Sequence, residues 1–265
     1  MSAQDFDARE SAAFGSAVAI VTGGTSGVGL ATARRLAEAG VPRILLVGRN
    51  PERGERAARE VSELGAEAVF RSADVTVPGD AVGVVAEAVD RWGRVDILVN
   101  SANGSGRPSL LVRTAIEDLL PTVVSQLAGV MHMTHAVREV MAAQESGAIV
   151  NVASDAAKSP TPGEAAIGAA MAGIVMFSRT AAMELKRNGI RVNIVTPSLI
   201  TGTGGYDRVQ QDEFSTKLFG KAIPLAQLGV VDAEDMAELI VFLCSPRAGK
   251  LTGQAISLNG GISAH

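Results

Sequence analysis

Short apolar runs alternate with longer segments of helical periodicity along most of the chain. The periodic segments predict helices at residues 28–39, 51–65, 80–92, 113–142 (with a break near Pro121) and 163–187. The apolar runs predict strands at residues 17–21, 44–47, 67–70, 96–100, 148–153, 191–196 and 255–258. Runs that are apolar on both faces are typical of parallel strands covered by helices. The pattern therefore predicts an α/β fold, with a doubly wound, mainly parallel, seven-stranded sheet and helices on both faces.

The alternating pattern begins only after residue 15 and then continues without interruption. Residues 1–15 are predicted to form an N-terminal extension, and residues 16–265 a single domain. Neither a linker nor a low-complexity tract divides the second range. A chain of 265 residues falls within the size range of single α/β domains and is long enough to bury a substantial core.

Composition and charge indicate a soluble intracellular protein. The formal net charge is −4, so no broad basic surface is expected for nucleic acid or an anionic membrane. The longest uncharged apolar run, residues 165–177, is too short to span a bilayer, and the polar N-terminus lacks the features of a signal peptide. Cys244 is the only cysteine, which excludes an internal disulfide and suits a reducing compartment. We expect a cytoplasmic protein without nucleic-acid or membrane partners.

A glycine-rich turn joins the first predicted strand to the first predicted helix. Glycine permits positive φ angles and lets the backbone approach a ligand closely. The helix that follows offers free N–H groups and a positive dipole end to a pyrophosphate. At this junction of a doubly wound sheet, such a turn predicts a Rossmann-type dinucleotide site rather than a purely structural turn. The candidate residues in the turn are Gly23, Thr25, Ser26, Gly27, Val28 and Gly29.

Six motifs, in order along the chain, resemble those of the short-chain dehydrogenase/reductase (SDR) family. Residues 22–29 match that family's Thr-Gly-x-x-x-Gly-x-Gly turn, and Asp74 with Val75 its adenine-contacting pair. The other four motifs lie at residues 96–103, 149–154, 189–197 and 252–261. The resemblance spans residues 16–262. It implies the family's Rossmann-type fold, a nicotinamide cofactor and oxidoreductase activity.

The resemblance also implies which residues bind the cofactor. In this family an acidic residue at the end of the second strand selects NAD, whereas this chain has Gly48 followed by Arg49. A guanidinium suits a 2′-phosphate and Ser26 adds a donor, so we expect NADP(H) in preference to NAD(H). The alternative is that Arg49 is only a solvated residue before a helix. Beyond the turn, the implied residues are Arg49, Asn50, Asp74, Val75, Asn100, Ser101, Ala102, Pro197, Ile200 and Thr203.

The family's chemistry depends on an Asn, a Ser, a Tyr and a Lys, of which the resemblance retains only the serine, Ser154. At the family's spacing, the tyrosine and lysine positions hold Ile167 and Met171, and neither side chain carries a proton. Gln126 stands at the Asn position, and the only tyrosine, Tyr206, lies in the loop that covers the substrate in similar proteins. A positioned general acid contributes about 10²–10⁴-fold in rate. Carbonyl reduction by the family's route is therefore expected to be slow or absent.

Three functions are compatible with these residues. The first is an NADP(H)-dependent oxidoreductase with non-standard or impaired chemistry, such as reduction of an activated C=C or C=N bond. The second is a non-catalytic binding module or structural subunit of a hetero-oligomer, and the third a cofactor-free lyase or isomerase. Asp155, Lys158 and Glu164, near the serine, are interpreted as solvated loop residues rather than replacement acids.

The long helix predicted at 163–187 is apolar all round to residue 182, so it needs a covering partner. We expect a homo-oligomer, dimeric or tetrameric as in similar proteins, with a hetero-oligomer containing a competent paralogue as the alternative. His132 and His135 share a helix face but have no further ligand residues nearby in sequence, so no metal site is predicted. The aromatic residues of the covering loop indicate a partly apolar small-molecule ligand; they are Tyr206, Phe214 and Phe219.

Overall fold

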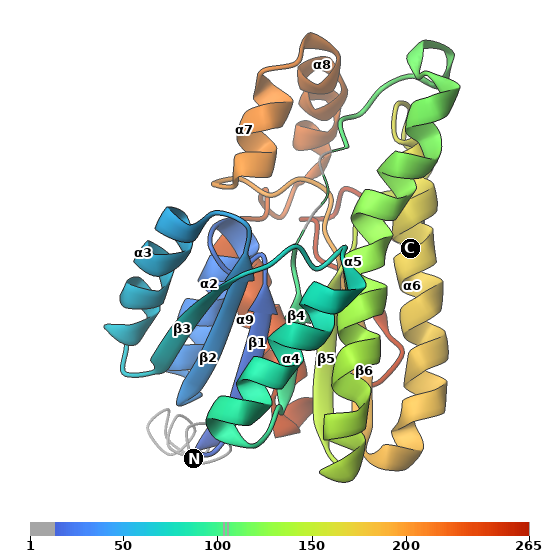
Figure 1. The fold of residues 1–265 in the computed structure, drawn as a ribbon. Coiled ribbons are helices and arrows are strands. Elements are labelled where there is room, and N and C mark those ends of the chain that lie inside the picture. Colours follow the sequence, from blue (N-terminus) through green and yellow to red (C-terminus); the bar gives the residue numbers. More distant parts are fainter. Residues whose placement is uncertain (1–13, 103, 105, 265) are drawn as a thin grey trace.

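The structure, a computed structural model, describes residues 14–102, 104 and 106–264 (Figure 1). Within this part of the chain, seven parallel strands form one sheet in the order β3-β2-β1-β4-β5-β6-β7. The strands are β1 (Val18–Thr22), β2 (Arg43–Gly48), β3 (Glu67–Ser72), β4 (Ile97–Asn100), β5 (Gly147–Val152), β6 (Ile190–Thr196) and β7 (Ala255–Ser257). The predicted doubly wound parallel sheet is confirmed.

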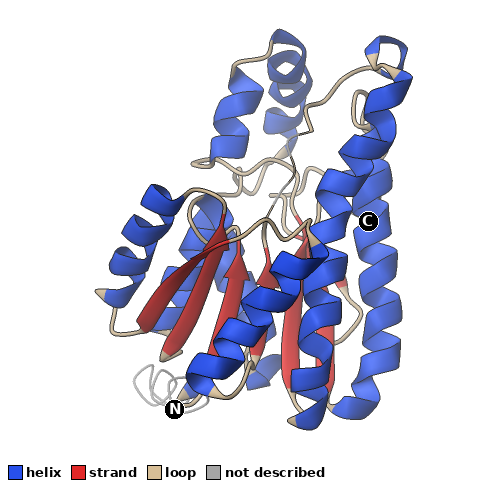
Figure 2. Cartoon of the chain, viewed as in Figure 1, coloured by secondary structure: helices blue, strands red, loops and turns tan. Residues whose placement is uncertain are grey.

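Helices cover both faces of the sheet (Figure 2). One core cluster joins the sheet to α2 (Gly27–Glu38), α3 (Pro51–Ser62) and α9 (Ala233–Cys244). A second joins the other face to α4 (Pro78–Trp92), α5 (Ile116–Ala143) and α6 (Ala165–Leu185). Two further helices, α7 (Gly204–Gln210) and α8 (Glu213–Ala222), lie beyond the carboxyl ends of the strands (Figure 1). Short 3₁₀ turns occur at Leu111–Arg113, Asp155–Ala157, Lys186–Asn188, Ile223–Leu225 and Pro246–Ala248.

The strand order reverses direction between β1 and β4. From β1 the chain first builds outward through β2 and β3, and then returns to place β4 on the other side of β1. The loops after these two central strands therefore turn away from each other and leave a crevice at the carboxyl edge, which is where doubly wound sheets bind ligands. The glycine-rich turn lies at this edge.

Helix α5 runs unbroken from Ile116 to Ala143, so the predicted break near Pro121 is wrong. Proline lacks an N–H group, which removes one intrahelical hydrogen bond, to the carbonyl of Glu117. Both residues are exposed, so water can satisfy that carbonyl. The helix therefore tolerates the proline in its second turn.

The start of the domain also differs from the prediction. Phe14 falls within the predicted extension, yet it is buried in the same core cluster as Leu36 and Ile240. Its carbonyl accepts a hydrogen bond from the N–H of Ala17 at 2.8 Å. The packed domain therefore includes Phe14, and the expected boundary after residue 15 lies too far along the chain. Residues 1–13 lie outside the described part.

One helical segment in the described part of the chain, Ala165–Asn188, is long and apolar enough to cross a membrane by length and composition alone. The uncharged run at residues 165–177 is only the first part of this segment. In the fold, α6 packs along α5 and β6 and buries residues that include Ile167, Ile174 and Ala182. Packing in the domain core accounts for part of this apolar composition, since 39% of its most apolar window is buried. The cytoplasmic location stays a prediction.

Candidate active site

The glycine-rich turn is held against the end of β4 by contacts that leave no room for side chains. Gly23 has a φ of +68°, and a Cβ there would lie 2.7 Å from the carbonyl oxygen of Ser101. A Cβ at Gly29 would lie 2.4 Å from the carbonyl oxygen of Gly23. Because real Cβ atoms do not approach so closely, glycine is required at both positions. The turn thereby presents the first residues of α2 to the crevice.

The start of α2 has the properties of an anion site. Its first turn holds no acidic residue, and the Ser26 side chain makes no capping hydrogen bond. Ser26 is exposed, so its hydroxyl and the first N–H groups of the helix face a groove of about 560 Å³. Ligand sites of proteins commonly have volumes of about 300–1,000 Å³. The turn and groove therefore fit the pyrophosphate of a dinucleotide.

Two arginines lie at the far end of the groove. The guanidinium of Arg49 is 3.9 Å from a carboxylate oxygen of Asp74, and its side chain is 73% exposed. A pair this exposed contributes at most about 1 kcal/mol, so Arg49 is free to turn toward a phosphate. Arg53, from the first turn of α3, donates a hydrogen bond of 3.2 Å to the hydroxyl of Thr25. Together they provide two cations for an anionic group between α3 and the glycine turn.

Asp74 is held ionised at the same end of the groove. The side chain and backbone N–H of Thr76 donate to its carboxylate at 2.7 and 3.0 Å. These hydrogen bonds, with a smaller contribution from Arg49, hold the pKa of Asp74 below its usual value. A carboxylate in this state accepts hydrogen bonds, as the exocyclic amine of an adenine would require.

The predicted cofactor residues take different positions around this groove. The side chain of Asn50 caps α3, because its oxygen accepts a hydrogen bond of 2.8 Å from the N–H of Arg53. Asn100 is buried and bonded to Asn151, and Pro197 lines the neighbouring cavity instead. The predicted residues that do line the groove are Gly23, Thr25, Ser26, Gly27, Val28, Arg49, Asp74, Val75, Ser101, Ala102, Ile200 and Thr203.

A cavity of about 200 Å³ adjoins the groove at the carboxyl ends of β4, β5 and β6. The two spaces share part of their lining, including Gln126, Ile200 and Thr203, so a ligand in the groove reaches the cavity. The cavity wall also holds Ser154 from the end of β5 and, from α6, Ile167 and Met171. Helices α7 and α8 close it from above with Tyr206 and Phe219. The sequence-predicted catalytic candidates, Ser154, Gln126 and Tyr206, are therefore brought together.

Ser154 lies two residues after the end of β5 and caps the 3₁₀ turn Asp155–Ala157. Its oxygen accepts a hydrogen bond of 3.2 Å from the N–H of Ala156, which leaves the hydroxyl proton available to a ligand. Gln126 from α5 accepts at 3.0 Å from the N–H of Gly104 and so fixes the loop after β4. Gln126 therefore orients the cavity wall, while Ser154 is the donor within it.

Glu164 is part of the cavity wall, so its interpretation as a solvated loop residue is wrong. It immediately precedes α6, and the loop that carries it folds back because the carbonyl of Gly163 accepts from the N–H of Ser109 at 2.7 Å. Burial raises the pKa of Glu164, although a hydrogen bond with Thr161 opposes this shift. Sequence spacing could not show that Glu164 lines the cavity, because its position depends on the hydrogen bond between Gly163 and Ser109, which lies between β4 and α5.

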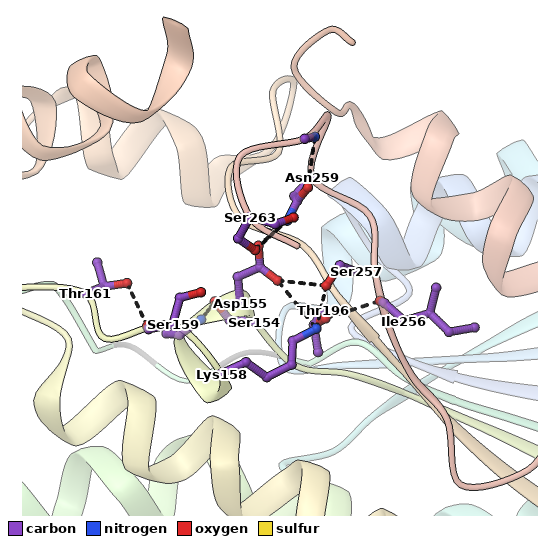
Figure 3. A network of polar contacts seen from close by, with 12 residues as sticks. Ser154, Asp155, Lys158, Ser159, Thr161, Thr196, Ile256, Ser257, Asn259 and Ser263 are labelled. Carbon is purple, nitrogen blue, oxygen red and sulfur yellow. Dashed lines mark hydrogen bonds and ion pairs between the residues drawn. The ribbon is translucent and has the colours of Figure 1, made fainter. Parts of the chain in front are cut away.

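Asp155 and Lys158 are not solvated either (Figure 3). Asp155 is buried, and its carboxylate accepts from Asn259 and, at 2.8 Å, from the hydroxyl of Ser263. Lys158 lies 3.8 Å from the same carboxylate and donates to Ser257. Burial lowers the pKa of Lys158, opposed by the attraction of Asp155. Figure 3 shows these groups linking the turn after Ser154 to the C-terminal segment, so they hold structure together beside the cavity.

Residues that sequence reasoning missed also line the two spaces. They include Arg53 and Thr76 in the groove, and Arg107 and Asp212 in the cavity. Arg53 lies in the first turn after the predicted helix cap Asn50, so its place next to the glycine turn could be predicted. The other three residues lie on loops whose course the pattern does not define. In the described part of the chain no cluster of three or more acidic, His or Cys side chains suits a metal ion. The ring of His132 instead contacts the carbonyl of Val75 at 3.2 Å.

Comparison with known proteins finds relatives that match most of the chain, including the residues of the groove and the cavity. The family model described as Enoyl-(Acyl carrier protein) reductase matches residues 23–263. A 3-oxoacyl-[acyl-carrier-protein] reductase of Synechocystis is 33% identical over 246 residues, which cover 92% of this chain and 96% of the relative. That of Bos taurus is 37% identical over 245 residues, with 92% and 97% covered.

Solved structures agree with these sequence relatives. Levodione reductase superposes with a TM-score of 0.88 and 29% identity, over 95% of this chain and all of the other. NAD⁺-bound xylitol dehydrogenase gives a TM-score of 0.85 and 30% identity, over 94% and 99% of the two chains. The similarity therefore extends over the groove and the cavity as well as the sheet.

Proposed function

Because the chain belongs to the short-chain dehydrogenase/reductase family of oxidoreductases, we propose that it binds NADP(H) in the groove and reduces a partly apolar substrate in the adjoining cavity by non-standard chemistry. The bound cofactor supplies a hydride. The observation that carries the proposal is the cavity wall, where Ser154 lies with Ile167 and Met171 and the cavity opens onto the groove.

The side chains of the cavity define what the protein contributes. The hydroxyl of Ser154 donates to a polar atom of the substrate, and the apolar side chains of Ile167 and Met171 shield that atom from water. Ile167 and Met171 have no proton to give, so they supply neither a general acid nor a neighbouring cation. The chemistry therefore favours a substrate that needs little help from a strong acid, such as an activated C=C or C=N bond.

Arg49 and Arg53 support NADP(H) as the cofactor. Their guanidinium groups offer charge-assisted hydrogen bonds to a 2′-phosphate, and β2 ends in Gly48 rather than in an acidic residue. The solved xylitol dehydrogenase holds NAD⁺. Cofactor choice is therefore set by such local side chains and not by the fold.

Calorimetric titration of the purified protein with NADPH, and in parallel with NADH, tests this function. We expect NADPH to bind roughly 10- to 100-fold more tightly, the effect of one hydrogen-bonded charged group. A panel of activated alkenes, imines and ketones, followed by loss of the reduced nicotinamide absorbance, then identifies the reaction. If neither nucleotide binds, the proposal is wrong.

A subunit in a larger assembly is the second candidate, and one observation favours it. Apolar side chains of the 3₁₀ turn Leu111–Arg113, of α5 and of α6 are exposed in the single chain: Leu111, Val112, Ile116, Leu120, Val124, Met131, Met176 and Met183. Exposed apolar side chains gathered on neighbouring helices favour a contact with another chain. A homo-oligomer formed through α5 and α6 covers them, and a paralogue with a complete catalytic set is the alternative partner. Sedimentation of the protein alone, and after coexpression with such a paralogue, distinguishes the two assemblies.

A further inference from the structure

We propose that the cavity beside Ser154 recognises a ligand with a positively charged nitrogen, and that Glu164 holds this cation. The ligand class is a protonated amine or an iminium ion with a small apolar body. For the redox step the inference rests on the proposed function, whereas ligand binding stands without it. Three features of the cavity lead to this conclusion: the half-buried carboxyl group of Glu164, the absence of a lysine at position 171 and the apolar side chains of Ile167 and Met171.

Glu164 is a half-buried carboxyl group in the described cavity wall, and burial raises its pKa. It lies three residues before Ile167, at the start of the same helix, so the two share a face of α6. The other charged groups of the described cavity lining are Arg107 and Asp212. Asp212 caps α8 by accepting from the N–H of Ser215 at 2.7 Å, and Arg107 lowers the pKa of Asp212, after that hydrogen bonding. Arg107 and Asp212 carry opposite charges and offset each other. Glu164 is therefore the carboxyl that is available to a ligand.

Met171 makes a cationic ligand acceptable. A lysine at this position would place an ammonium in the cavity wall and would repel a second cation. The thioether of Met171 carries no charge and, with Ile167, contributes a low-dielectric wall. A carboxylate beside such a wall attracts a cation more strongly than one in water. Lys158, the nearest lysine in sequence, faces Asp155 and Ser257 instead (Figure 3).

An iminium substrate also fits the lack of a proton donor at the positions of Ile167 and Met171. When its carbon accepts a hydride from the reduced nicotinamide, the π electrons of the C=N bond return to nitrogen and the product is a neutral amine. The hydride supplies both electrons, the positive charge of the iminium is discharged, and no proton leaves the protein. A ketone, in contrast, becomes an alkoxide that needs a proton, which Ile167 does not have.

Binding of a cation is linked to the ionisation of Glu164. Burial favours its neutral form in the empty cavity, and an opposite charge nearby favours the ionised form. At pH values below the raised pKa of Glu164 the cation therefore displaces a proton on binding, and its affinity rises with pH until the carboxyl is fully ionised. The other charged or ionisable side chains in the described lining of the cavity are Arg107, Asp212 and Tyr206.

Calorimetric titration of the full chain, without any nucleotide, tests the inference. The probes are 2-phenylpyrrolidine, which is protonated in neutral buffer, and its neutral counterpart of the same shape, 2-phenyltetrahydrofuran. We expect the amine to bind more tightly than the ether, with an affinity that rises with pH across the raised pKa of Glu164 when the titration is repeated from acidic to neutral buffers. Glu164→Gln should weaken amine binding by about 10- to 100-fold, abolish this pH dependence and leave the ether unchanged.

Two matched variants complete the experiment. Glu213→Gln makes the same chemical change on an exposed residue outside the cavity lining and should have no effect. Met171→Lys keeps Glu164 but adds a cation to the cavity wall, so it should weaken binding of the amine and leave binding of the ether unchanged. This variant tests the inference on its own if Glu164→Gln does not fold. Equal affinities for amine and ether, no binding of the amine up to its solubility limit, or unchanged amine binding in both cavity variants overturns the inference. None of these results depends on nucleotide binding, so failure of the proposed function is recognised separately.

Discussion

Asn100 of β4 donates a side-chain hydrogen bond of 2.9 Å to Asn151 of β5, and the two residues are in register across the parallel pair. Asn151 in turn donates to the hydroxyl of Ser178 on α6 at 2.8 Å. All three side chains are buried. This chain of polar groups ties the central strands to the helix that carries Ile167 and Met171, directly below the cavity.

Asn151→Leu should destabilise the fold by about 1–3 kcal/mol, because it leaves the amide of Asn100 buried without its acceptor. Urea unfolding of the variant, with an unchanged slope against denaturant, measures the loss. Asn100→Leu combined with Asn151→Leu should cost less than the sum of the single changes, since both partners are then apolar. Additive effects would show that the hydrogen bond contributes little.

Arg49→Ala should weaken NADPH binding by roughly 10- to 100-fold and change NADH binding little, because only NADPH carries the 2′-phosphate. Arg53→Ala should act in the same direction, through the loss of a cation and of the contact with Thr25. Arg56→Ala, an exposed change on the same helix outside the groove lining, is the control. Equal losses of affinity for both nucleotides would show that Arg49 does not distinguish NADPH from NADH.

Ile167→Tyr combined with Met171→Lys should raise ketone reduction by about 10²–10⁴-fold over the parent, because it adds a proton donor and a neighbouring cation to the cavity that holds Ser154. Turnover of NADPH with a panel of ketones is the measurement. The matched control is Ile167→Phe with Met171→Lys, which has the same ring without the hydroxyl. Activity in the control equal to that of the tyrosine variant would contradict the assignment of these positions.

Asp155→Ala should loosen the C-terminal segment and destabilise the fold by about 1–3 kcal/mol, since the amide of Asn259 and the hydroxyl of Ser263 lose an acceptor. Amide hydrogen exchange in the segment after β7, together with its trimming by a carboxypeptidase, reports the loosening. Asp207→Ala, at an exposed position of α7, is the control. Unchanged protection of the segment would show that other contacts hold it.

The chain pattern alone determined the layered fold. Alternating strand and helix signals and the glycine turn predicted seven parallel strands and the first helix to within a residue or two, because local periodicity and turn chemistry act over a few positions. The resemblance to the family's motifs, and not the periodicity, singled out Ser154, Ile167 and Met171, which all line the cavity. The strands and the first helix needed only spacing along single elements.

Tertiary structure decided what lies opposite those residues. Glu164 enters the cavity because its loop is held by Ser109, and Asp155 is buried because the C-terminal segment folds back onto it. Phe14 joins the core for the same reason, since its partners lie on α2 and α9. Each depends on segments far apart in sequence, whose contacts leave no periodic signal. Burial and the pKa shifts that follow from it are therefore properties of the folded chain and not of its sequence pattern.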